Sequence, residues 1–114
     1  MAEDVIYINV EEGLKRVMNN AKLFSNLLIK FKNYTHLNDI ETALEQGDME
    51  SAKNSAHTLK GLAANLSLIE LFKQVLELET QLKNGVVDKE LLAVVKKVFD
   101  QTFIEIDKVI AQNA

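Results

Sequence analysis

The 114-residue chain contains no proline and only four glycines. Proline interrupts a helix because it lacks a backbone N–H and its ring clashes with the preceding turn, so nothing in this chain forbids long helices. Leucine, lysine, glutamate and alanine are among its commonest residues, and all four are good helix formers. The sequence therefore predicts an all-α domain.

Apolar residues recur at steps of three and four along the chain, which is the pattern of helices that each bury one face. After a loose lead-in over residues 1–9, this pattern predicts a short helix that carries Leu14, Val17 and Met18. Four longer helices follow. They run over residues 21–46, from Met49 to Leu66, between Ser67 and Asn84, and from Asp88 through Ile110.

Capping residues mark the helix ends. Asn9, Asn20, Asp48 and Asp88 can each cap an N-terminus, and Gly47 and Asn84-Gly85 are stop signals. Ser67-Leu68-Ile69-Glu70 has the form of a capping box. Asn38-x-x-Glu41 has a similar form and leaves open a break between Asn33 and Asn38, but we favour one helix over residues 21–46. Short connections make neighbouring helices antiparallel, so we expect a single domain over residues 1–114, an antiparallel four-helix bundle with a short additional N-terminal helix.

Composition and charge exclude several function classes. A formal net charge of −4 argues against general nucleic-acid binding, which needs a basic face to neutralise phosphates. No apolar run approaches the roughly 20 residues that span a bilayer, and the first residues lack the features of a signal peptide. The chain has no cysteine and hence no disulfide or thiol chemistry. We expect a cytoplasmic protein that binds neither nucleic acid nor membrane.

His57 lies away from the apolar stripe of its predicted helix, which consists of Ala52, Ala56, Leu59, Ala63 and Leu66. At about 100° per residue, the centre of that stripe lies roughly 150° around the helix from His57, whereas Lys53, Lys60, Gly61 and Ala64 fall within roughly 60° of it. A glycine inside a helix costs about 1 kcal/mol relative to alanine, so Gly61 suggests that something approaches the backbone closely there. Together with Ala64 it leaves a clearing beside the imidazole, flanked by positive charge. Such a clearing suits a partner protein that carries a phosphoryl group.

The run Ala56-His57-Thr58-Leu59-Lys60-Gly61-Leu62-Ala63-Ala64-Asn65-Leu66 resembles the signature of histidine-containing phosphotransfer (HPt) domains of two-component phosphorelays. The resemblance extends over most of the chain, at Gly13-Leu14, Leu23-Phe24, Leu27-Leu28, Phe31, Ala43-Leu44, Gly47-Asp48 and Leu78-Glu79. Ser67-Leu68 stands where such domains often have Gly-Ala. We expect this departure to affect only the end of the histidine helix.

Three residues are candidates for the chemistry. Neutral His57 offers a lone pair, expected on Nε2, for nucleophilic attack on a phosphoaspartate. Glu79 lies at the border of an apolar stripe, where it either pairs with Lys83 on the surface or accepts a hydrogen bond from His57 Nδ1 and fixes the tautomer. The resemblance favours the second alternative. Lys60 lies one turn from His57 and can stabilise the charge of the transferring phosphoryl group, a role that the resemblance also implies.

Docking of the partner is assigned to Gly61 and Ala64. Lys53 is a weaker docking candidate, because a solvated lysine needs no explanation. The other histidine, His36, has no nearby carboxylate spacing and is interpreted as a surface residue. Two histidines in different helices, without HxxxH or ExxH pairing, make a metal site unexpected.

The leading hypothesis is a phosphorelay intermediate in which phospho-His57 carries a phosphoryl group between receiver-domain aspartates. Its partners would be response-regulator receiver domains and a hybrid sensor histidine kinase. The chain has no Gly-rich nucleotide loop, so we expect no ATP site and no cofactor of its own, with Mg²⁺ supplied on the receiver. The protein would be a monomer and a phosphocarrier, with transferase activity only beside a partner.

Two other hypotheses stay open. One is a passive helical adaptor that docks a partner at the Gly61 and Ala64 face without chemistry. The other is a domain phosphorylated directly by an ATP-binding kinase domain, like the phosphoacceptor segment of chemotaxis kinases. Substitution of His57 separates the first from phosphotransfer, and the identity of the phosphoryl donor separates the second.

Overall fold

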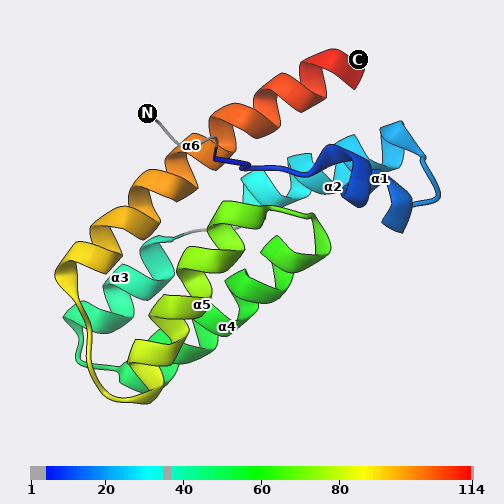
Figure 1. The fold of residues 1–114 in the computed structure, drawn as a ribbon. Helices are drawn as coiled ribbons and strands as arrows, with labels where there is room; N and C mark the ends of the chain where they lie inside the picture. Colours follow the sequence, from blue (N-terminus) through cyan, green and yellow to red (C-terminus); the bar gives the residue numbers. More distant parts are fainter. Residues whose placement is uncertain (1–4, 35–36, 114) are drawn as a thin grey trace.

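The computed structural model describes residues 5–34 and 37–113. Over these residues the chain forms six α-helices and no strand, so the predicted all-α class is confirmed. The helices are α1 (Val10–Arg16), α2 (Ala21–Tyr34), α3 (Asn38–Glu45), α4 (Met49–Asn65), α5 (Ile69–Lys83) and α6 (Lys89–Asn113) (Figure 1). None of the described helices is both long and apolar enough to cross a membrane.

The helices pack mainly on their neighbours in the chain. α3 packs on α4, α4 on α5 and α5 on α6, while the long α6 returns to lie along α2 (Figure 1). One apolar core joins them, and its fully buried members include Phe24, Leu28, Ile40, Leu71 and Ile106. Asn9, Asn20 and Asp48 each accept a hydrogen bond from a backbone N–H three residues later, as expected of N-caps.

The prediction of one helix over residues 21–46 is wrong, because α2 ends at Tyr34 and α3 begins at Asn38. The reason is the phase of the apolar residues. In a continuous helix at about 100° per residue, Leu37 and Ile40 would point roughly 180° away from Leu28 and Phe31. All four side chains are buried, and the break lets both stripes face the core. Leu37, rather than Asn38, occupies the N-cap position of α3, and no side-chain cap forms there.

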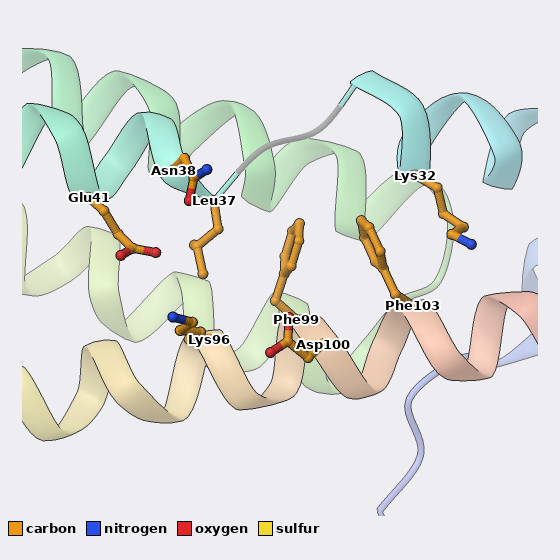
Figure 2. A pocket seen from close by; sticks show the side chains of 8 residues that line it. All are labelled: Lys32, Leu37, Asn38, Glu41, Lys96, Phe99, Asp100 and Phe103. Carbon is orange, nitrogen blue, oxygen red and sulfur yellow. The ribbon is translucent and has the colours of Figure 1, made fainter.

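The break also leaves a hollow of about 180 Å³ over α6. Figure 2 shows the rings of Phe99 and Phe103 rising side by side from α6, with Leu37 extending down from the start of α3 beside Phe99, Lys32 on α2 at one end and Lys96 on α6 toward the other. The Phe99 and Phe103 rings lie 4.6 Å apart between centroids, and each also contacts Phe31. The three rings, Phe31 on α2 and Phe99 and Phe103 on α6, form an aromatic cluster that joins the two helices.

The predicted first helix is too long at its end. α1 stops at Arg16, Met18 and Asn19 adopt left-handed backbone angles, and the Met18 side chain is 91% exposed rather than buried. Gly13, in the middle of α1, is buried against the ring of Phe24. The close packing of α1 on α2 therefore depends on the missing side chain at Gly13.

The predicted capping box at Ser67 to Glu70 is also wrong. Ser67 has φ +57° and ends α4 in a Schellman motif, with hydrogen bonds from Ser67 N–H to the Ala64 carbonyl and from Leu68 N–H to the Ala63 carbonyl. Glycine is the usual residue at this position, since it has no Cβ to clash. Glu70 accepts a hydrogen bond from the Gln74 side chain instead.

Ser67 is tied to the N-terminal part of the chain. Its hydroxyl donates to Glu12 Oε1 at 2.8 Å and accepts a hydrogen bond from the guanidinium of Arg16. Within the predicted lead-in, the Asn9 N–H donates to the Ser67 carbonyl and the Tyr7 carbonyl accepts from the Ile69 N–H. Residues 7–16 therefore lie against the turn between α4 and α5, so the serine has effects beyond the end of the histidine helix.

Candidate functional site

The imidazole of His57 projects from the outward face of α4. The five residues of the predicted stripe, Ala52, Ala56, Leu59, Ala63 and Leu66, are all buried. The His57 side chain, on another face, is 70% exposed. The amphipathic spacing of α4 thus fixes its inner face in the core and leaves the histidine exposed to solvent.

Glu79 lies against His57 from the neighbouring helix α5. It is one of the buried residues of α5 together with Leu78 and Leu82, and its side chain is only 3% exposed. Its Oε2 lies 2.7 Å from His57 Nδ1, and its Oε1 lies 2.6 Å from Lys60 Nζ. A single buried carboxylate therefore bridges the imidazole and the ammonium group.

The charge on Glu79 is stabilised by these contacts. Burial acts to raise the pKa of Glu79, but hydrogen bonds from Lys60 and His57 and the positive charges of Lys60 and Lys83 outweigh it, so the net pKa lies below the ordinary 4.5. Glu79 is thus ionised at neutral pH and accepts hydrogen bonds only. Neutral His57 must then carry its proton on Nδ1, which leaves the lone pair on Nε2.

Lys60 is turned toward Glu79. Its side chain is 21% exposed, and its ammonium group forms an ion pair with the buried Glu79 carboxylate rather than projecting into solvent. Lys83, the alternative surface partner of Glu79, adds its charge without an ion pair to Glu79 within the described residues. Lys53, the weaker docking candidate, pairs with Glu50 at 3.2 Å on its own helix.

The clearing beside His57, formed by Gly61 and Ala64, is accessible to solvent. Gly61 is exposed, and a Cβ added there would meet no other group within 4 Å. Ala64, one turn further, is half-buried. Packing within the chain therefore does not require glycine at position 61.

One feature of this face was not found by sequence reasoning. Beyond Ala64 the surface opens into a hollow that Ile69 and Phe72 of α5 line on one side and α1 on the other. Ile69 is 38% exposed although it is a large apolar residue. The sequence analysis placed Ile69 only within the predicted capping box, because the approach of α1 to this turn is not visible in local spacing.

Within residues 5–34 and 37–113, no group of three or more histidine, cysteine, aspartate or glutamate side chains is placed to hold an ion. His36, interpreted above as a surface residue, lies outside the described residues.

Comparison with known families adds to this geometry. The family model of the Hpt domain matches residues 32–108, which is more than half of the chain and includes His57, Lys60 and Glu79. Searches of curated proteins and of solved structures find no match. Membership of this family implies phosphotransfer in two-component systems. An exposed histidine held by a buried glutamate, in an all-helical chain that matches this family model, leads to one conclusion: the chain belongs to the Hpt-domain family.

Proposed function

We propose that this chain carries a phosphoryl group between the aspartates of receiver domains, with His57 as the phosphoacceptor. The observation that carries the proposal is that Glu79 holds one ring nitrogen of an otherwise exposed histidine. Nδ1 is held at 2.7 Å by the buried carboxylate of Glu79, while the His57 side chain as a whole is 70% exposed. The hydrogen bond from Nδ1 to Glu79 therefore orients the imidazole, and the nucleophilic Nε2 on the other side of the ring is left for a partner.

The transfer step follows from this arrangement. The Nε2 lone pair attacks the phosphorus of an aspartyl phosphate, a P–N bond forms, and the P–O bond to the aspartate breaks. The aspartate leaves as a carboxylate, and no proton has to move during the attack. The imidazole gains positive charge as the bond forms, and ionised Glu79 stabilises that charge through the hydrogen bond from Nδ1. The reverse reaction passes the phosphoryl group to a second aspartate.

Lys60, Gly61, Ala64 and Lys53 complete the proposed site. Lys60 places positive charge one turn from His57, where phosphoryl oxygens gather negative charge, and it also keeps Glu79 ionised. Gly61 and Ala64 let the receiver approach α4 closely. Lys53 has a secondary part at the edge of the docking surface, since it is paired with Glu50.

The partner supplies the remaining chemistry. We assign the aspartate and its Mg²⁺ to the receiver domain, and the supply of phosphoryl groups to a hybrid sensor histidine kinase, with no ATP site on this chain. A cytoplasmic location, a monomeric state, a single domain over residues 1–114, and the absence of nucleic-acid and membrane partners stay predictions. The antiparallel four-helix arrangement of α2 and α3, α4, α5 and α6 is likewise part of the proposal, supported by the order in which these helices pack.

The test is transfer of labelled phosphate from a phosphorylated receiver domain in Mg²⁺. We expect wild type to take up acid-labile, alkali-stable label, and the His57→Gln variant to take up none. His36→Gln is the matched control, because it removes the chain's only other histidine, and it should label like wild type. Tight receiver binding without transfer would refute the proposal in favour of a passive adaptor, and label that appears only with an ATP-binding kinase domain would favour direct phosphorylation.

A further inference from the structure

A hollow of about 240 Å³ opens where α1 meets the end of α4 and the start of α5. Ala64, Leu68, Ile69 and Phe72 form its apolar sides, and Glu12 and Arg16 of α1 form the opposite rim. Leu68 is fully buried, while Ile69 leaves 38% of its surface exposed. An apolar surface of this kind, open to solvent and continuous with the clearing at Ala64, is suited to a partner.

The rim charges are already neutralised within the chain. Arg16 Nη2 donates to Glu12 Oε1 at 3.0 Å, and Ser67 donates to the same oxygen at 2.8 Å. Arg16 also donates to the Ser67 hydroxyl. Because the two opposite charges pair with each other, the hollow does not call for a charged ligand, and its apolar sides favour an apolar one.

The hollow lies within reach of a partner centred on His57. Ala64 is seven residues from His57 on α4, which is a distance of about 10 Å along the helix. A standard interface covers about 800 Å² per partner, equivalent to a disc of about 16 Å radius, and a small transient one of about 600 Å² has a radius of about 14 Å. A receiver domain centred on His57 would therefore reach Ala64, where the hollow begins.

We propose that this hollow receives one apolar side chain of the receiver domain while the receiver is docked on His57. The inference rests on the proposed function and deepens it. A cavity of about 150 Å³ lined by apolar residues is large enough to bind benzene, so the hollow accommodates an aromatic or branched aliphatic side chain. We assign the occupant to the receiver because the hollow includes Ala64, on the same helix as His57.

α1 contributes to this surface from outside the segment that matches the Hpt family. Glu12 and Arg16 precede residue 32, whereas His57, Lys60 and Glu79 follow it. The residues of the chemistry and one wall of the hollow thus come from different parts of the chain. The hollow is a contact that selects the partner, and it does not touch the reacting atoms.

The test compares two isoleucine substitutions. Ile69→Ser removes an apolar wall of the hollow, and Ile104→Ser makes the same change at a 50% exposed isoleucine on α6, which contributes nothing to the hollow. We expect kcat/KM for transfer from a phosphorylated receiver to fall about tenfold in Ile69→Ser and to stay at the wild-type value in Ile104→Ser. Direct labelling of His57 by phosphoramidate, a donor too small to need docking, should be equal in all three proteins.

Each other outcome overturns the inference. Unchanged transfer in Ile69→Ser would refute the docking of a receiver side chain in the hollow and leave the proposed function intact. Loss of phosphoramidate labelling in that variant would place the effect on His57 or on folding. If Ile69→Ser does not fold, Ile69→Thr, which keeps the branched shape, must show the same selective loss. A change in the oligomeric state of the free Ile69→Ser chain would assign the hollow to a second copy, and a wild type that accepts phosphate from no receiver would refute the proposed function itself.

Discussion

Replacing Gly61 by alanine should make the protein more stable and less active. Gly61 lies inside α4, and a Cβ there meets nothing within 4 Å, so the methyl group causes no clash. Alanine is favoured over glycine in a helix interior by about 1 kcal/mol. For a domain of this size we expect the melting temperature to rise by about 3–6 °C.

The matched control is Gly13→Ala, the same substitution in a second helix. Here the new Cβ would lie 2.6 Å from two ring carbons of Phe24, which is itself only 1% exposed and cannot easily move. Overpacking of this kind costs about 1–3 kcal/mol. Because the gain in helix propensity is shared, the free energies of unfolding of the two variants should differ by about 1–3 kcal/mol, with Gly61→Ala the more stable.

Chemical denaturation and transfer kinetics together check the reasoning. If Gly61 serves docking, Gly61→Ala should lower kcat/KM for receiver transfer by about tenfold or more, since displacing a positioned reactant by about 1 Å costs up to about 10²-fold. Labelling by phosphoramidate should not change. A destabilised Gly61→Ala protein, or one that transfers as fast as wild type, would refute the assignment of this glycine to partner approach.

Three further perturbations test the network around the site. The folded-state pKa of Glu79 lies below 4.5, so its ionisation stabilises the fold above about pH 4.5, and this contribution is lost as pH falls through the folded-state pKa. The stability difference between wild type and Glu79→Gln should therefore shrink from about pH 4.5 downward. Denaturation measured at several pH values checks this. Lys60→Met should lower the free energy of unfolding by about 1–3 kcal/mol and raise the pKa of Glu79, seen as acid unfolding at higher pH, whereas Lys53→Met should do neither. Ser67→Gly should be about 1 kcal/mol more stable than Ser67→Ala in denaturant, because both lose the hydroxyl but only glycine relieves the left-handed φ; equal stabilities would contradict the strain.

The sequence predicts well those features that depend on neighbours along one helix. The stripe on α4, the N-caps at Asn9 and Asp48, and the glycine turn at Gly47 are all local patterns, and the structure contains each of them. The break before Asn38 was also accessible, because the six-residue step from Phe31 to Leu37 puts the second apolar stripe out of phase with the first.

Features that depend on a second helix were not decided by local spacing. The predicted capping box paired Ser67 with Glu70, three residues away, whereas its hydrogen-bond partners Glu12 and Arg16 lie more than fifty residues earlier. Lys60 lies about 60° around α4 from His57, but its spacing does not say that α5 packs on that side and draws the ammonium onto Glu79. The same spacing left two partners open for Glu79 itself.

The ion pair between Lys60 and Glu79 explains how a buried carboxylate can serve a neutral histidine. Burial alone would raise the pKa of Glu79 and favour its protonated form, and a protonated acid would no longer favour a proton on Nδ1. The hydrogen bond and charge of Lys60 offset that effect of burial, so the Glu79 carboxylate is ionised and in contact with His57 Nδ1 in the free protein. In the proposed transfer, the attack would change charge only on the imidazole and the phosphoryl group, with no rearrangement of the buried pair. Under this proposal the part of the site inside the protein stays fixed, and recognition of the partner is assigned to the open surface of α4, α5 and α1.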